Sequence, residues 1–96
     1  MTPGDDLALT KTEIFDRLTK VLRSVFDNEE LVATPTLTAK HVNGWDSLNN
    51  VRLFLEVEGE FAVRFSATEI SSLKSVGELA DLVGRKTHRT AYTQRP

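Results

Sequence analysis

The chain has 96 residues, enough for one small domain, and 40% of them are hydrophobic. It contains no cysteine, which excludes disulfides and thiolate chemistry by the protein itself. No apolar run reaches the length of about 18 residues that a membrane-spanning helix needs. Residues 1–83 hold eight basic and fourteen acidic residues, whereas residues 84–96 hold four basic residues and no acid. The acidic body disfavours binding to nucleic acid phosphates and favours basic protein partners.

Residues 1–9 lack hydrophobic periodicity, so we expect a flexible N-terminal segment. This segment is acidic and polar, unlike a secretory signal peptide, which predicts a cytoplasmic location. Thr10 and Glu13 have the spacing of a capping box. In this motif, the side chain of each residue accepts a hydrogen bond from the backbone N–H of the other at the start of a helix. Apolar residues then recur on one helical face and predict a helix to about residue 26: Ile14, Phe15, Leu18, Val21, Leu22, Val25 and Phe26.

Residues 27–45 show no sustained helical or strand period. A connection of this length inside a compact domain usually has a function. Three apolar residues are expected to hold the loop against the core: Leu31, Leu37 and Val42. Trp45, near the end of the loop, is open to two interpretations. It either plugs the end of a helical bundle or contacts a partner.

Asp46 and Ser47 introduce the next predicted helix, which extends to about Glu60. The Asp46 carboxylate suits the N-cap position, where it accepts hydrogen bonds from free N–H groups and faces the positive end of the helix dipole. Ser47 is then the first helical residue, with its hydroxyl pointing outward.

Apolar residues of this helix form two separate stripes at about 100° per residue. The stripe predicted to face the core contains Leu53, Phe54, Val57 and Phe61. A second stripe begins beside the serine and contains Leu48, Val51 and Leu55. One stripe is enough to pack a helix into a small bundle. The second one is therefore either buried under the loop or the third helix, or serves as a docking surface.

Two further capping boxes follow, at Ser66–Glu69 and at Ser75–Glu78. The first predicts a short helix to about Leu73, preceded by an extended link over residues 62–65. The second predicts the last helix, whose buried residues are Val76, Leu79, Ala80, Leu82 and Val83. Gly84 is expected to stop this helix.

Together these elements predict an all-α four-helix bundle with three longer helices, a short third helix and a long first loop. The predicted domain covers residues 10–84, and residues 85–96 are expected to form a flexible basic tail.

The run Asp46-Ser47-Leu48, with the apolar spacing that follows it to Phe61, resembles the acyl carrier protein family over about residues 42–83. The resemblance implies the same fold. It also implies that Ser47 carries 4′-phosphopantetheine, whose thiol bears acyl groups, with Asp46 helping the attaching enzyme to recognise the site. In this family the positions matching Leu48, Val51 and Leu55 face partner enzymes, and Glu56 and Glu58 are expected to steer a basic partner toward them.

The resemblance also implies a set of partners. These are a phosphopantetheinyl transferase, an acyl-loading ligase or acyltransferase, and a synthase or other acyl-processing enzymes. Neither a nucleic acid nor a membrane is expected as a partner, and a monomer is predicted. No metal site is expected, because His41 and His88 stand alone.

The chain departs from the family pattern just after the serine. Typical fatty-acid carriers have acidic residues there, whereas this chain has Asn49, Asn50 and Arg52, and Gly59 interrupts a run that is usually acidic. This favours a dedicated carrier for a specialised lipid or secondary-metabolite pathway. Aminoacyl carriers usually show a glycine-rich run before the serine, and this chain does not, which favours acyl cargo.

Other functions are possible for a serine in this position. A catalytic nucleophile needs a general base and an oxyanion pocket. The segment lacks the second glycine of a Gly-x-Ser-x-Gly elbow, and His41, the sole nearby base, is more simply explained as a solvated loop residue. The sequence thus predicts a carrier that other enzymes act on. An unmodified carrier-like interaction domain, an aminoacyl carrier and a small DNA-binding domain remain as alternatives.

Overall fold

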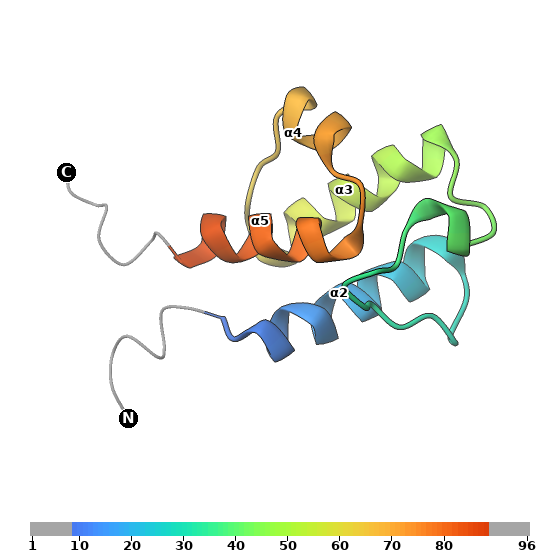
Figure 1. Ribbon diagram of the computed structural model, residues 1–96, viewed down its shortest axis with the longest axis horizontal. Helices are drawn as coiled ribbons and strands as arrows, with labels where there is room; N and C mark the ends of the chain where they lie inside the picture. The colour runs from blue at the N-terminus through green and yellow to red at the C-terminus, as the bar shows by residue number, and fades with distance from the viewer. Residues whose placement is uncertain (1–8, 89–96) are drawn as a thin grey trace.

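The computed structural model describes residues 9–88, so the predicted flexible N-terminus lies outside the described residues except for Leu9. The described chain contains α2 (Lys11–Phe26), the short 3₁₀ helix η1 (Ala39–His41), α3 (Ser47–Phe61), α4 (Ala67–Ser72) and α5 (Val76–His88), and no strand. The helix α2 packs against both α3 and α5, and the long loop between α2 and α3 crosses one end of the bundle (Figure 1). This confirms the all-α fold with a short third helix and a long first loop.

The core lies between the three longer helices and is apolar throughout. The most completely buried side chains come from α2, α3 and α5: Leu18, Leu22, Leu53, Val57, Val76 and Val83. Among residues 9–87, no polar or charged residue is buried. Ile70 and Leu73, at α4, pack against this core but stay half-buried. Burial of each large apolar side chain stabilises the fold by about 1.5–3 kcal/mol, so the predicted inward stripes account for the arrangement of the long helices.

Capping boxes define where α2 and α4 begin. The Thr10 hydroxyl accepts a hydrogen bond from the Glu13 N–H at 3.1 Å, and the Glu13 carboxylate accepts one from the Thr10 N–H at 2.8 Å. Ser66 and Glu69 exchange the same two bonds at the start of α4. Both predicted boxes are therefore confirmed.

The third predicted capping box forms only in part. The Glu78 N–H donates to the Ser75 hydroxyl at 3.2 Å, as expected. The Glu78 carboxylate, however, accepts from the Lys74 N–H at 2.7 Å instead of bonding the Ser75 backbone. The side chain reaches back one residue further than in a standard box, so it ties the α4–α5 link to the first turn of α5.

The last helix does not end at Gly84, as the sequence predicted, but continues to His88. A glycine ends a helix by adopting a positive φ, and among the described glycines only Gly44 does so. The four residues after Gly84 thus belong to the helical domain, whereas the sequence assigned them to a tail over residues 85–96. Residues 89–96, the rest of that predicted tail, lie outside the described range.

Apolar side chains hold the long loop against the bundle. Val42 is buried, and Leu31 and Leu37 are half-buried against the core. The sequence analysis missed Ala33, which is also buried and whose N–H donates to the Thr19 hydroxyl at 2.9 Å. The three predicted contacts are present, and the additional one fixes the middle of the loop to α2.

Backbone hydrogen bonds connect the same loop to the start of α5. The Val76 N–H donates to the Leu37 carbonyl at 2.9 Å, and the Gly77 N–H donates to the Pro35 carbonyl at 3.1 Å. A β-carbon on Gly77 would stand 2.7 Å from that Pro35 oxygen. This close approach requires glycine at position 77.

We expect Gly77→Ala to destabilise the fold by about 1–3 kcal/mol, because the added methyl group collides with backbone that has little freedom to move. Gly59→Ala is the matched control, since a β-carbon there has no neighbour within 4 Å and lies inside α3. That change should stabilise the fold by up to about 1 kcal/mol, because alanine is a better helix former. Urea denaturation followed by circular dichroism measures both. Equal stability of the two variants would contradict the assigned role of Gly77.

Candidate functional site

Ser47 stands at the surface as the first residue of α3. Asp46 is the N-cap, with an extended backbone, and its carboxylate accepts a hydrogen bond from the Asn49 N–H at 2.9 Å. Within residues 9–88, the Ser47 hydroxyl has no hydrogen-bond partner, and neither the Ser47 nor the Leu48 N–H has an acceptor. The structure therefore offers an unengaged hydroxyl and two free N–H groups at the positive end of a capped helix.

The turn before the serine is held by the Gly44 carbonyl. It accepts hydrogen bonds from the Asp46 N–H at 2.9 Å and from the Asn49 side chain at 2.7 Å. Gly44 itself has φ +87°, a left-handed conformation that other residues adopt only with strain. The approach to Ser47 is thus rigid on both sides, by a glycine turn before it and a helix after it.

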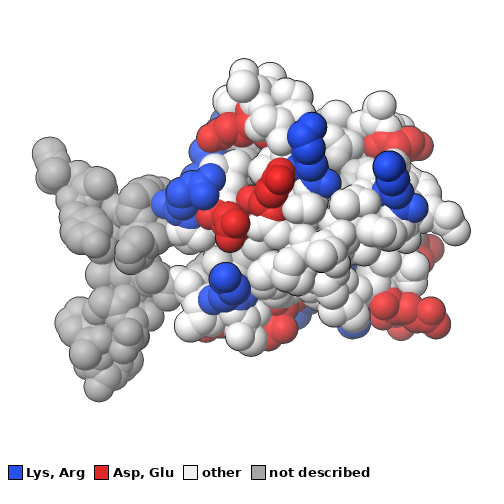
Figure 2. Space-filling model, in the orientation of Figure 1, with Lys and Arg blue, Asp and Glu red and all other residues white. Residues whose placement is uncertain are grey.

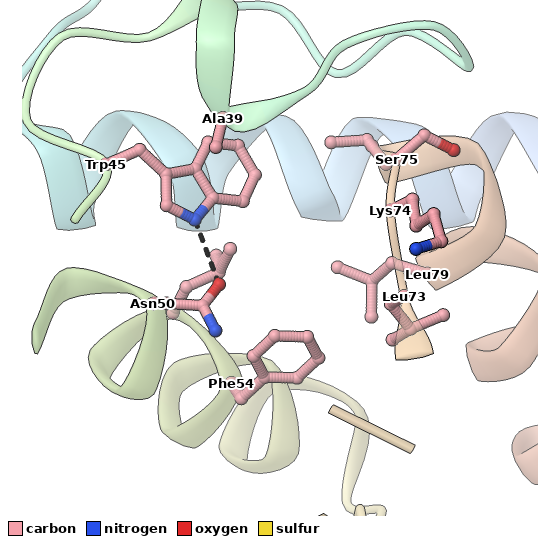
Figure 3. Close-up of a pocket in the computed structure, with 10 residues that line it drawn as sticks. Ala39, Trp45, Asn50, Phe54, Leu73, Lys74, Ser75 and Leu79 are labelled. Atoms are coloured by element: carbon pink, nitrogen blue, oxygen red, sulfur yellow. Dashed lines mark hydrogen bonds between the residues drawn. The ribbon is translucent and has the colours of Figure 1, made fainter. Parts of the chain in front are cut away.

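Trp45 belongs to the end of the bundle. Its ring is half-buried and lies 5.2 Å from the Phe26 ring, centroid to centroid. Its Nε1–H donates to the Asn50 side-chain oxygen at 2.9 Å (Figure 3). These contacts agree with the first interpretation of Trp45, a plug at the end of the bundle. In the sequence, Asn50 stands out only as a departure from the acidic residues typical of fatty-acid carriers, and its bond to Trp45 is not predicted.

A cavity of about 80 Å³ lies behind the Trp45–Asn50 pair (Figure 3). Most of its lining is apolar, and it reaches from α3 to the start of α5; its residues are Ala39, Trp45, Asn50, Leu53, Phe54, Leu73, Lys74, Ser75, Val76 and Leu79. A shallow surface groove contains Ser47 and Asp46 and shares Ala39, Trp45 and Asn50 with this cavity. The groove beside Ser47 and the mainly apolar cavity thus adjoin each other across these three side chains.

The second apolar stripe of α3 is exposed. The fractional exposure is 70% for Leu48, 53% for Val51 and 61% for Leu55. The loop and α4 therefore leave these residues uncovered, which removes burial as an explanation for the stripe. A contiguous exposed apolar surface beside a free hydroxyl is typical of an interaction site.

The charged residues predicted for this face differ in what they contact. Arg52 is exposed, and its guanidinium donates to the Asn49 side-chain oxygen at 3.2 Å. Glu56 is exposed as well. Glu58 is half-buried and accepts from the Phe65 N–H at 2.8 Å, so its carboxylate holds the link between α3 and α4. Asn49 joins Arg52 to the turn at Gly44, a role that the sequence did not predict.

His41 is engaged in the loop. Its Nδ1 accepts from the Thr38 N–H at 3.0 Å and thereby closes the turn of η1.

Within residues 9–88, no group of three or more His, Cys, Asp or Glu side chains is placed to hold a metal ion. In the same range, no helix combines the length and hydrophobicity needed to cross a membrane.

The small helical bundle, with a free serine at a helix start beside an exposed apolar stripe, is typical of carrier domains. No protein-family model matches the chain. Among solved structures, the chain is similar to the holo acyl carrier protein of Geobacter metallireducens, determined in solution by NMR. The two share 37% sequence identity over 81% of this chain and 90% of that chain, with a TM-score of 0.76. The chain belongs to the acyl carrier protein family, and it is a carrier protein rather than an enzyme.

We expect Asp46→Ala to lower the stability of the domain by about 1 kcal/mol, because the Asn49 N–H loses its acceptor. Asp46→Asn should retain most of that stability, since asparagine caps a helix equally well. Thermal and urea unfolding followed by circular dichroism give both values. If alanine and asparagine variants are equally stable, the carboxylate does not hold the start of α3.

Proposed function

We propose that this protein carries acyl groups as thioesters on a 4′-phosphopantetheine arm attached to Ser47 Oγ. It delivers them to partner enzymes of a specialised lipid or secondary-metabolite pathway. The observation that carries the proposal is the exposed, unbonded hydroxyl at the start of α3. The similar structure is that of a holo acyl carrier protein, which gives further support. We expect the protein to act in the cytoplasm. We also expect a monomer, because a single free domain can reach several enzymes in turn.

The residues around Ser47 suit such a group. The free N–H groups of Ser47 and Leu48 provide a favourable place for a phosphate at the helix start. The Asp46 carboxylate repels the phosphate and, because it is held by the Asn49 N–H, directs the arm away from the helix end. When bound, the group supplies the thiol on which thioesters form. The chain has no cysteine and therefore no thiol of its own.

Attachment requires Ser47 Oγ to attack the phosphorus of a pantetheine pyrophosphate donor, with the nucleotide phosphate as leaving group. Phosphoryl transfer depends on positioning and on stabilisation of charge, which the phosphopantetheinyl transferase provides. The carrier contributes an accessible oxygen on a rigid platform. Gly44, with open space around its α-carbon, and the small polar Asn49 leave room for the enzyme to approach.

The cavity behind Trp45 and Asn50 supports an acyl cargo. Its leucine, valine and phenylalanine side chains favour an aliphatic chain, and an aminoacyl ammonium group would lose hydration there without an acidic partner, because the charged residue of the lining is Lys74. Its small volume, about 80 Å³, suits a short chain. The Trp45–Asn50 pair lies between this cavity and the groove beside Ser47, so we expect it to influence which chains enter from the serine side.

The exposed stripe of α3 supports a docking role for Leu48, Val51 and Leu55. Arg52 lies among them, held toward Asn49, and Glu56 follows one turn later. A matching partner presents an apolar patch, an acidic group opposite Arg52 and a basic group opposite Glu56. Glu58 contributes mainly through its bond to the Phe65 N–H, which fixes the end of the docking helix.

Incubation with a phosphopantetheinyl transferase and coenzyme A should increase the intact mass by one phosphopantetheine group. Ser47→Ala should abolish the increase, because no other hydroxyl stands at the start of α3. Ser24→Ala, which removes another exposed helical hydroxyl, is the matched control and should be modified fully. An unchanged mass of the native chain, or an increase that survives Ser47→Ala, would refute the attachment site. An unchanged mass would leave an unmodified interaction domain as the explanation.

Arg52→Glu should raise kcat/KM with an acyltransferase of primary fatty acid synthesis, because that class of partner is expected to be basic at the docking face. The same change should reduce activity with the dedicated partner enzyme. Lys20→Glu, an equal charge change at an exposed position of α2, is the control and should alter neither value appreciably. Initial rates with holo protein at low ionic strength measure the effect. If Arg52→Glu and Lys20→Glu behave alike, Arg52 does not select partners.

A further inference from the structure

A second groove lies at the other end of α3 from Ser47. Its floor is apolar and consists of Ala62, Val63 and Leu82. Charged side chains form its rim: Arg64, Glu69, Arg85 and Lys86. The rim combines residues from the α3–α4 link, from α4 and from the last turns of α5, which the sequence analysis assigned to a flexible tail.

The one acidic residue on the rim is already engaged. Glu69 accepts a hydrogen bond from the Ser66 N–H at 2.8 Å, and its other carboxylate oxygen lies 3.1 Å from the Lys86 ammonium. The Ser66 N–H, together with Lys86, lowers the pKa of Glu69 below its usual value. Lys86 also lies over the Phe65 ring, 5.6 Å from its centroid. Glu69 and Lys86 thus neutralise each other.

The guanidinium groups of Arg64 and Arg85 have no such partner. Both side chains are exposed, and neither guanidinium forms a hydrogen bond or an ion pair with any residue from 9 to 88. Figure 2 shows Lys and Arg atoms near the end of α5, beside the grey terminal residues, with Asp and Glu atoms next to them. Arg85 lies near the negative end of α5, where a positive charge is favourable. Arg64 lies on the link between α3 and α4 and has no such stabilisation. Two guanidinium groups without an ion-pair partner therefore line one groove with an apolar floor.

We propose that this groove binds an acidic segment of a partner protein. Two carboxylates of the segment pair with Arg64 and Arg85, and an apolar side chain between them rests on Ala62, Val63 and Leu82. Guanidinium groups bind carboxylates through two parallel hydrogen bonds, which makes arginine the residue best suited to such a site. A concave apolar floor accommodates a side chain, whereas a flat anionic lipid surface would contact the rim alone.

The position of the groove indicates what such binding achieves. Ser47 and Phe61 are the two ends of α3, so at about 1.5 Å per residue the groove lies about 20 Å from the serine. A partner held there leaves both Ser47 and the exposed stripe beside it accessible. The groove would therefore tether the carrier to an assembly and raise its effective concentration near the enzymes that use it. This role goes beyond the proposed function and does not require modification of Ser47.

The test uses the full chain and a fluorescein-labelled peptide of alternating glutamate and leucine residues, titrated by fluorescence anisotropy. Arg64→Glu/Arg85→Glu should weaken binding about tenfold or more, and Arg64→Gln/Arg85→Gln by a smaller factor. Lys20→Glu/Lys40→Glu changes the net charge equally at exposed positions outside the groove and should weaken binding less than about twofold. In ¹⁵N NMR spectra the peptide should shift the amides of Val63 and Leu82.

Ser47→Ala should bind the peptide as the native chain does, so failure of the attachment site and failure of this proposal are distinguishable. A peptide with glutamine in place of glutamate should not bind. Absence of binding to the acidic peptide would overturn the proposal, as would equal losses for the two double charge reversals. Binding to phosphatidylglycerol vesicles but not to the peptide would assign the groove to lipid and would also overturn it.

Discussion

The hydrogen bond from the Asn49 N–H to the Asp46 carboxylate determines where α3 begins, and the rest of the site depends on that start. Each residue turns an α-helix by about 100°. If the helix began one residue later, its first residue would be Leu48, and the serine would be part of the preceding turn. A defined start therefore places a hydroxyl at the surface and keeps it in a fixed relation to the two apolar stripes that follow.

Those two stripes give one helix two functions. Leu53 and Val57 are fully buried and contribute to stability, whereas Leu48 and Leu55 are exposed by more than half. Exposed apolar side chains do not stabilise a monomer, so their presence is explained by contact with other molecules. The same helix anchors the fold on one side and presents the candidate attachment and docking surface on the other.

Charge separates the two ends of α3. At the serine end, the Asp46 carboxylate occupies the cap and Arg52 is held by Asn49. At the other end, Arg64 and Arg85 converge on the second groove. Because the two ends of the domain present different charges, different partners can bind them at the same time. If both proposals hold, the second groove keeps the carrier near its enzymes while Ser47 is in use.

Features that depend on residues within one or two helical turns could be predicted from the chain alone. The capping boxes at Thr10 and Ser66 and the two stripes of α3 are of this kind, because hydrogen bonds and helical faces follow directly from spacing. Features that depend on contacts between distant residues, or on a backbone angle, required the folded structure. Gly84 is compatible with both a helix and its end, and only packing selected the former. Likewise, no spacing rule brings Arg64 and Arg85 to the same groove, since this depends on the path of the link between α3 and α4.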